Sequence, residues 1–232
     1  MESSNILKKF LAKIRVQQPP FDLTPRATGN DVIEAADQGF EPLYREVDHE
    51  SLPWFWPKLD PDFKQSLQDL DLSSGKVLDV GTGSGRQAIE LAGRGFETWA
   101  SDFSGAALEY GKAKAAAEGV KVTFVIDNVC HTRIEGQVFD AIFDRGCFHV
   151  IPPLQRAEYI TSIERLLAAG GYLFLKCFSR DEPPRPGPFR FSPEEIEDLF
   201  GENFSLVTIR KTEFHGSRPV HPKALFAVLK RI

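Results

Sequence analysis

From residue 75 onward, short apolar runs alternate with segments of helical periodicity, and this alternation is the strongest constraint on the fold. Parallel strands need long connections, which are usually helices packed on the sheet, so the alternation predicts an α/β fold. The first five strands are expected at 76–80, 97–102, 121–127, 139–144 and 171–178. Helices are expected between them at about 85–94, from Ser104 onward and at about 154–168.

The C-terminal part adds one helix and two strands. Ser192, Pro193 and Glu195 form a capping box with proline at the first helical position, which predicts a helix of about eight residues. Two further strands are expected at 205–214 and 223–232, and their connection is too short for a helix. This last pair should therefore be antiparallel, within a seven-stranded, doubly wound and mostly parallel sheet.

Residues 1–74 are expected to form an N-terminal helical cap or lid, followed by a core over 75–232 within one structural domain. Helical spacing occurs early in this segment and again behind Pro61, at Phe63, Leu67 and Leu70. The early apolar positions are Ile6, Leu7, Phe10, Leu11 and Ile14. An aromatic segment, LPWFWP, stands between the two helical stretches at 52–57.

The charge balance and the cysteines exclude several classes of protein. The chain has 28 Lys and Arg against 33 Asp and Glu, a formal net charge of −5, so the basic excess of a nucleic-acid-binding protein is missing. Cys130, Cys147 and Cys177 form no C-x-x-C pair, so neither a disulfide framework nor a metal site is expected. There is no apolar run of membrane-spanning length. We therefore expect a cytoplasmic protein, monomeric or homodimeric, without nucleic-acid or membrane partners.

The most specific motif is VLDVGTGSG at 77–85. A predicted strand carries Asp79 near its end and is followed by Gly81, Gly83 and Gly85, at the start of a predicted helix. Glycines here let the backbone turn tightly and approach a ligand, while the helix N-terminus offers free N–H groups. A dinucleotide fingerprint would require glycine or alanine where Arg86 stands, so a bound pyrophosphate is not favoured.

These residues resemble the first motif of the class I S-adenosylmethionine-dependent methyltransferases, an acidic residue followed by G-x-G-x-G. The resemblance spans about 75–232 and implies a Rossmann-like sheet with helices on both faces. It implies S-adenosyl-L-methionine as cofactor and S-adenosyl-L-homocysteine as product. Asp102 would bind the ribose hydroxyls, Phe103 would lie against the adenine, and Asp127 would bind the adenine amino group. The implied cofactor-binding set is Asp79, Gly81, Thr82, Gly83, Gly85, Asp102, Phe103, Asp127, Asn128, Val129 and Asp144.

Each acidic residue also has a structural interpretation, as a helix cap or a turn residue. Their occurrence at three successive strand ends favours cofactor binding.

A second resemblance concerns one branch of this family, the thiopurine, tellurite-resistance and thiol or halide methyltransferases. DRGCFHVIPP at 144–153 resembles that branch's D-x-G-x-x-H motif, through Asp144, Gly146 and His149. The segment YREVDHESLPWFWPKLDPDF resembles its P-W-D-x-x-x-P-x-P segment, but Phe55 replaces the usual Asp and Trp56 stands near the usual Gly. The branch implies in-line methyl transfer to a small acceptor such as a thiol, a halide or a metalloid.

His149 is the candidate general base, because an unperturbed imidazole titrates near neutral pH. The alternative is a structural imidazole that bonds a loop carbonyl. Asp144, the second candidate catalytic residue, is expected to contact the methionine end of the cofactor or to fix its loop. The candidate substrate-binding residues are Trp54, Trp56, Arg145 and Phe178. Aromatic side chains here would suit a sulfonium or an apolar substrate, although they could simply pack the cap on the sheet.

Two alternative functions stay open. A protein or RNA acceptor is disfavoured by the acidic net charge and by DRGC, where an N/D-P-P-Y/F motif would be expected. A non-catalytic S-adenosylmethionine-binding module would keep the glycine loop without turnover. Cys147 and Cys177 lie near the active edge and could bind a metalloid through soft thiolates, or they could be small buried apolar residues.

Overall fold

The computed structural model describes residues 40–184 and 187–232, so the apolar helix predicted around Ile6–Ile14 lies outside the described residues. The strands are β1 (Lys76–Val80), β2 (Glu97–Asp102), β3 (Val122–Ile126), β4 (Phe139–Arg145), β5 (Leu167–Ser179), β6 (Arg190–Phe191), β7 (Phe204–Glu213) and β8 (Lys223–Arg231). The helices are α3 (Pro61–Asp69), α4 (Arg86–Ala92), α5 (Gly105–Ala117), α6 (Arg156–Leu166) and α7 (Pro193–Phe200). Short 3-10 turns are η1 (His49–Ser51), η2 (Val129–His131), η3 (Phe148–Val150) and η4 (Pro153–Gln155).

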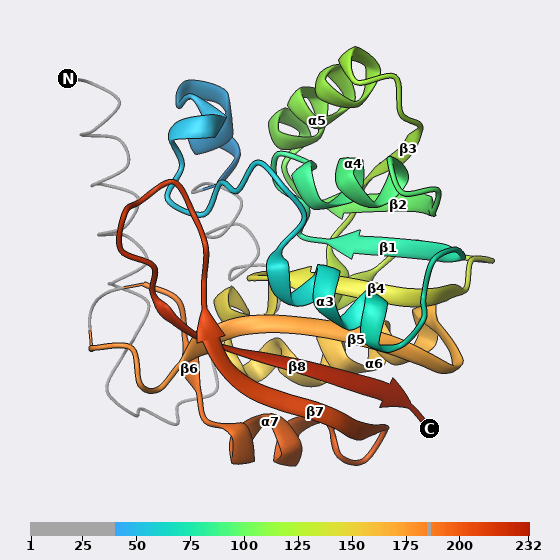
Figure 1. Cartoon of the computed structure of the whole chain (residues 1–232), viewed down its shortest axis with the longest axis vertical. Coiled ribbons are helices and arrows are strands. Elements are labelled where there is room, and N and C mark those ends of the chain that lie inside the picture. Colours follow the sequence, from blue (N-terminus) through green and yellow to red (C-terminus); the bar gives the residue numbers. More distant parts are fainter. Residues whose placement is uncertain (1–39, 185–186) are drawn as a thin grey trace.

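The strands form one sheet in the order β3-β2-β1-β4-β5-β8-β7 (Figure 1). The first five strands pair in parallel, and β8 is antiparallel to both β5 and β7, which confirms the predicted topology. The structure has one strand more than predicted, because the two-residue β6 pairs with the end of β5. In addition, β5 begins at Leu167 rather than at residue 171.

Local sequence signals account for the helix starts. The Ser192 side chain accepts from the backbone N–H of Glu195, while the Glu195 carboxylate accepts from the Ser192 N–H, so the predicted capping box is present. Ser104 caps α5 through its side chain alone, which accepts from the Ala107 N–H. Asp60 caps α3 ahead of Pro61, whose fixed φ suits the first turn of a helix.

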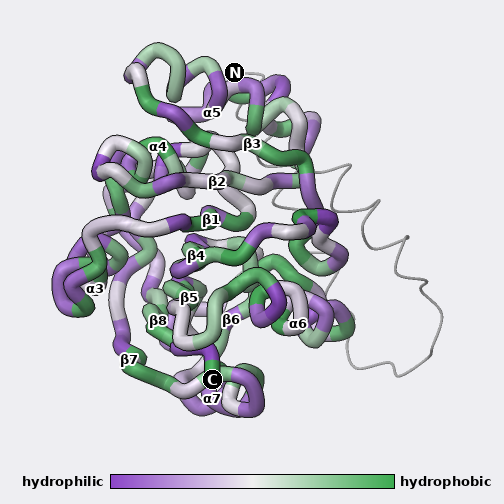
Figure 2. The backbone as a smooth tube through the Cα atoms, turned by 90° about the vertical axis from the view of Figure 1, so that its right-hand side faces the viewer, coloured by the Kyte–Doolittle hydropathy of each residue, from purple (hydrophilic) through white to green (hydrophobic). Residues whose placement is uncertain are grey.

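Apolar side chains from successive strand positions alternate between two clusters on opposite faces of the sheet. One cluster joins Leu78 and Ile142 to α6 and α7, and the other joins Val77 and Phe143 to α3. Figure 2 shows the strands stacked between α3 on one side and α6 on the other. Helices therefore cover both faces and leave the carboxyl ends of the parallel strands for residues 40–57. In the part of the chain that the structure describes, no helix is long and apolar enough to cross a membrane.

Candidate functional site

The glycine loop at 81–85 leaves β1 and leads into α4. Gly81, Gly83 and Gly85 have φ values of 61°, 52° and 74°, a left-handed conformation that favours glycine. A Cβ on Gly81 would stand 2.7 Å from the Cβ of Cys147, and a Cβ on Gly83 would stand 2.5 Å from the hydroxyl of Tyr44. Gly81 and Gly83 are therefore required both by the turn and by the close approach of neighbouring side chains.

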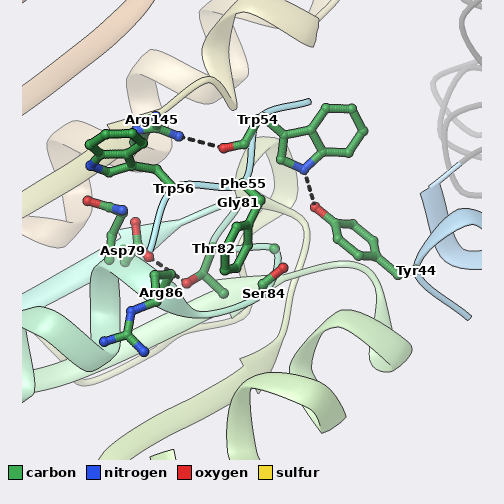
Figure 3. Close-up of a pocket in the computed structure, with 12 residues that line it drawn as sticks. Tyr44, Trp54, Phe55, Trp56, Asp79, Gly81, Thr82, Ser84, Arg86 and Arg145 are labelled. Atoms are coloured by element: carbon green, nitrogen blue, oxygen red, sulfur yellow. Dashed lines mark hydrogen bonds between the residues drawn. The ribbon is translucent and has the colours of Figure 1, made fainter. Parts of the chain in front are cut away.

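A pocket lies between the glycine loop and an aromatic roof, which we define as Trp54, Phe55 and Trp56 (Figure 3). Its lining residues are Tyr44, Trp54, Phe55, Trp56, Asp79, Gly81, Thr82, Gly83, Ser84, Arg86, Gln87 and Arg145. Seven of the predicted site residues meet here: Trp54, Trp56, Asp79, Gly81, Thr82, Gly83 and Arg145. The other five were not predicted as site residues, although Phe55 lies in the aromatic segment, Ser84 within the glycine motif and Arg86 directly after it.

The aromatic roof is held by two hydrogen-bonded anchors (Figure 3). The indole N–H of Trp54 donates to the Tyr44 hydroxyl at 3.1 Å. Arg145 donates through Nη1 to the Trp54 carbonyl at 2.9 Å, through Nε to Asp60 at 2.8 Å and through Nη2 to the His215 carbonyl. Arg145 was predicted to contact substrate, but its guanidinium is largely buried and already joins three segments of the chain. This arrangement favours a positioning role for Arg145.

Asp79 lies at the floor of the pocket. Its carboxylate accepts a hydrogen bond from the Thr82 hydroxyl. Burial raises the pKa of Asp79 to about 7, and the negative charge of Asp144 acts in the same direction. The positive charge of Arg145, which also lines the pocket, acts in the opposite direction.

Asp102 ends β2 and is also buried. Its Oδ2 accepts from the Gly83 N–H at 2.8 Å and its Oδ1 from the Ser104 N–H at 2.9 Å. Burial raises the pKa of Asp102 to about 6. Because a carboxylate can accept about four hydrogen bonds, Asp102 can still accept one from a ribose hydroxyl. The ring of Phe103 stands edge-on to Phe40, with the centroids 5.8 Å apart.

Asp127 lies beside Asp102, because its backbone N–H donates to the Asp102 carbonyl at 3.0 Å. The Asp127 carboxylate accepts from the Arg133 N–H at 2.8 Å, while Asn128 caps η2 and Val129 is buried. The predicted adenine contacts therefore stand next to the predicted ribose contact. Since none of Gly85, Asp102, Phe103, Asp127, Asn128 and Val129 lines the pocket, their cofactor contacts stay predictions.

Asp144 is fully buried and organises the loop after β4. Its carboxylate accepts from the N–H groups of Cys147 and Phe148, at 2.8 and 2.9 Å, and from the Tyr159 hydroxyl at 2.7 Å. Burial raises the pKa of Asp144 to about 6. Asp144 was predicted either to contact the methionine end of the cofactor or to fix its loop. These contacts favour the second role, because both carboxylate oxygens bind residues that do not line the pocket.

His149 belongs to η3, within that loop, and does not line the pocket. Its Nδ1 accepts from the Phe178 N–H at 3.2 Å, and its ring packs against the rings of Phe178 and Phe214. Burial lowers the pKa of His149 to about 3, and the positive charges of Arg145 and Arg190 act in the same direction. Such an imidazole is a weak base at neutral pH, which favours the structural alternative. Phe178 contacts His149 and does not line the pocket.

Both cysteines near this edge are thiols. Burial raises the pKa of Cys147 and of Cys177 above the ordinary thiol value. Because soft-metal ligation uses the thiolate, the metalloid-binding alternative is not favoured.

Comparison with known proteins agrees with this geometry. Residues 77–171 match a family of methyltransferase domains. The chain is 27% identical over 186 residues to a 2-heptyl-1-hydroxyquinolin-4(1H)-one methyltransferase of Mycobacteroides abscessus, covering 77% of this chain and 81% of that protein. It is 27% identical over 163 residues to a probable thiol methyltransferase 2 of Arabidopsis thaliana, covering 69% and 72% of the two chains.

The fold is shared with a solved structure. A Burkholderia thailandensis 1,6-didemethyltoxoflavin-N1-methyltransferase, crystallised with 1,6-didemethyltoxoflavin and S-adenosylhomocysteine, superposes with a TM-score of 0.71. The alignment covers 91% of this chain and 93% of that one, at 21% sequence identity.

The described residues fit the cofactor of these enzymes. The pocket borders the left-handed glycine loop, and the buried carboxylate of Asp79 is part of its lining. S-Adenosylmethionine carries positive charge on its sulfonium, which a carboxylate and aromatic faces both stabilise. The glycine loop, the strand order and the matches together identify the chain as carrying a class I S-adenosylmethionine-dependent methyltransferase domain, related to the branch that includes the thiol methyltransferases.

Proposed function

We propose that this chain methylates a small-molecule acceptor held beneath the aromatic roof. The observation that carries the proposal is the roof itself, in which Trp54, Phe55 and Trp56 stand over the glycine loop and bound the pocket. S-Adenosylmethionine supplies a methyl group on a positively charged sulfur, ready for displacement. The protein's task is then to align the acceptor, exclude water and keep the sulfonium among aromatic faces and carboxylates.

The roof supports a flat, apolar acceptor. Its aromatic side chains offer large apolar faces that stack on planar rings. The indole N–H of Trp56 is buried and has no hydrogen-bond partner among the described residues, so it is free to donate to an oxygen, nitrogen or sulfur of the acceptor. The Mycobacteroides relative is named for a hydroxyquinolinone and the Burkholderia structure holds a didemethyltoxoflavin, which are both small molecules.

A thiol or an acidic hydroxyl is favoured as the methylated group, because such groups ionise readily and need only weak general-base assistance. His149, with its pKa lowered to about 3, offers little such assistance. Halide and metalloid acceptors belong to the same branch but would use less of the aromatic roof. We place the reaction in the cytoplasm, on the ground that Cys130, Cys147 and Cys177 are all free.

The test is methyl transfer from S-adenosylmethionine labelled on the methyl group. The purified chain is incubated with hydroxyquinolones, aromatic thiols and simple halides, and separately with protein and RNA from a cell extract. We expect label in the acid-soluble products of the aromatic hydroxyl or thiol compounds. Label confined to acid-insoluble material, removed by protease or ribonuclease, would overturn the small-molecule proposal.

Asp102→Ala is the variant that links this assay to the cofactor site. It should weaken cofactor affinity by about 1–3 kcal/mol, because ribose hydroxyls would lose a buried carboxylate partner. Calorimetric binding of S-adenosylhomocysteine measures this effect independently of any acceptor. Tight binding without methylation of any acceptor in the panel would favour the non-catalytic alternative.

A further inference from the structure

We propose that Glu213, His215 and His221 form a binding site for one divalent transition-metal ion of the Zn²⁺ class, at the turn of the β7–β8 hairpin. Each residue offers one ligand atom, and the three atoms all lie within 4.8 Å of one another. Two imidazoles and one carboxylate match the nitrogen and oxygen ligands that Zn²⁺ takes in sites with an open position. None of the three is a predicted cofactor residue, and the argument for the site does not rest on the proposed methyl transfer.

The distances require little rearrangement. His221 Nδ1 lies 3.5 Å from Glu213 Oε2. Tetrahedral ligands about 2.1 Å from Zn²⁺ are separated by about 3.4 Å, so this pair already has the required spacing. The His215 atom lies up to 4.8 Å from the others and needs a shift of about 1 Å, within the reach of a side-chain rotation.

The hairpin holds the three side chains together. Glu213 ends β7 and pairs with Lys223, the first residue of β8, and the Phe214 N–H donates to the Pro222 carbonyl at 2.8 Å. The backbone pairing at the base of the turn therefore holds the segments that carry His215 and His221 close together. The His215 carbonyl is bound by the Arg145 guanidinium, which fixes the backbone from the other side.

The state of the imidazoles also suits metal binding. The Nδ1 of His215 is buried and lacks a hydrogen-bond partner within residues 40–184 and 187–232, an arrangement that costs free energy unless a ligand is bound. Glu213 supplies the negative charge that a divalent cation requires.

The site adjoins the pocket. The Trp56 ring, part of the aromatic roof, lies 5.0 Å from the His215 ring and 6.2 Å from the His221 ring. In Figure 1 the turn between β7 and β8 rises beyond the strand ends toward residues 40–57. A bound cation would therefore reinforce the support of the roof at Trp56.

The experiment measures metal binding by the full chain after treatment with a chelator. We expect one equivalent of Zn²⁺ by calorimetry, Co²⁺ absorption in the visible typical of a low-coordinate site, and no comparable binding of Mg²⁺. Glu213→Gln and His221→Gln should each weaken Zn²⁺ binding by more than about tenfold. Glu213 is 64% exposed in its side chain, so its replacement should leave the fold intact, which a thermal melt checks.

His131→Gln is the matched control, because His131 is exposed and lies in η2 outside this group. It should bind Zn²⁺ as the wild type does. The proposal is overturned if the wild type binds no Zn²⁺. It is equally overturned if the folded Glu213→Gln and His221→Gln variants keep wild-type affinity, since the ion would then be bound elsewhere.

Discussion

The hydroxyl of Tyr44 stands so close to Gly83 that a Cβ on this glycine would lie 2.5 Å from the Tyr44 oxygen. The same hydroxyl accepts the indole N–H of Trp54 at 3.1 Å, so the glycine loop and the aromatic roof meet through a single side chain. The glycine that lets the backbone approach a ligand also lets the roof approach the loop.

Gly83→Ala should therefore damage both elements. The substitution places an alanine at φ 52° and displaces Tyr44, so we expect S-adenosylhomocysteine affinity to fall at least about tenfold. Gly119→Ala is the matched control, because Gly119 has φ 69° but no atom within 4 Å of an added Cβ. Calorimetry should show normal cofactor binding for Gly119→Ala. Equal losses in the two folded variants would attribute the effect to backbone strain alone.

Asp79→Asn should change the pH dependence of stability. The pKa of Asp79 is about 7 in the folded protein against an ordinary 3.8, so the folded state holds this proton more tightly. The raised pKa therefore contributes its whole share of the unfolding free energy below about pH 3.8, and this contribution is lost as the pH rises through about 7. Without cofactor, Asp79→Asn should lessen the decline in unfolding free energy between about pH 5 and pH 8 by roughly 2 kcal/mol.

Urea unfolding at the two pH values measures the effect of Asp79→Asn. Thr82→Val, which removes the hydroxyl donor to Asp79, should act in the opposite sense and steepen the decline. If the unfolding free energies of the wild type and of Asp79→Asn declined equally with pH, the raised pKa would not belong to Asp79.

Lys176→Met should destabilise the fold strongly. Lys176 is fully buried and lies 2.7 Å from a carboxylate oxygen of Asp60 and 2.7 Å from one of Asp62. Asp60 would keep Arg145 and Asp62 would keep Arg210, but each buried carboxylate would lose a charged hydrogen-bond partner, so we expect a loss on the order of 3 kcal/mol in urea unfolding. Lys211→Met removes a lysine from an exposed pair with Asp181 and should leave the midpoint nearly unchanged.

His149→Ala tests the candidate base. With a pKa of about 3, the imidazole stays neutral throughout the working range, so a structural role predicts a variant-to-wild-type turnover ratio that is constant between about pH 6 and pH 8. A ratio that falls along a titration near pH 6.5 would restore His149 as a general base. A parallel melt should show reduced stability, because the Phe178 N–H loses its acceptor.

Most of the architecture could be predicted from local signals, because apolar runs, helical spacing and caps act within a few residues of one another. The start of β5 was missed since Gly170 and Gly171 interrupt its apolar pattern, and β6 because two residues carry no periodicity. Both depend on pairing with strands distant in the sequence.

The part of the site that lies within a single sequence motif could be predicted. The glycine loop and Asp79 stand together in VLDVGTGSG, so their spacing alone indicated a ligand site. Tyr44 and Gln87 reach the pocket only through tertiary packing, and no local pattern marks them. The Glu213, His215 and His221 group was likewise missed, because its members meet only when the hairpin closes.

Because Arg145 binds residues outside the core, the core cannot be separated from the N-terminal segment without loss. One guanidinium on β4 joins the Trp54 carbonyl and the Asp60 carboxylate, which are close together in the sequence, to the His215 carbonyl, which is far from both. A fragment beginning at residue 75 would keep the sheet and the glycine loop but would leave a buried cation without its carboxylate. The sheet with its glycine loop and the roof over it are therefore held as one unit, and a graft of residues 40–57 alone would not carry the Asp60 and His215 partners of Arg145 with it.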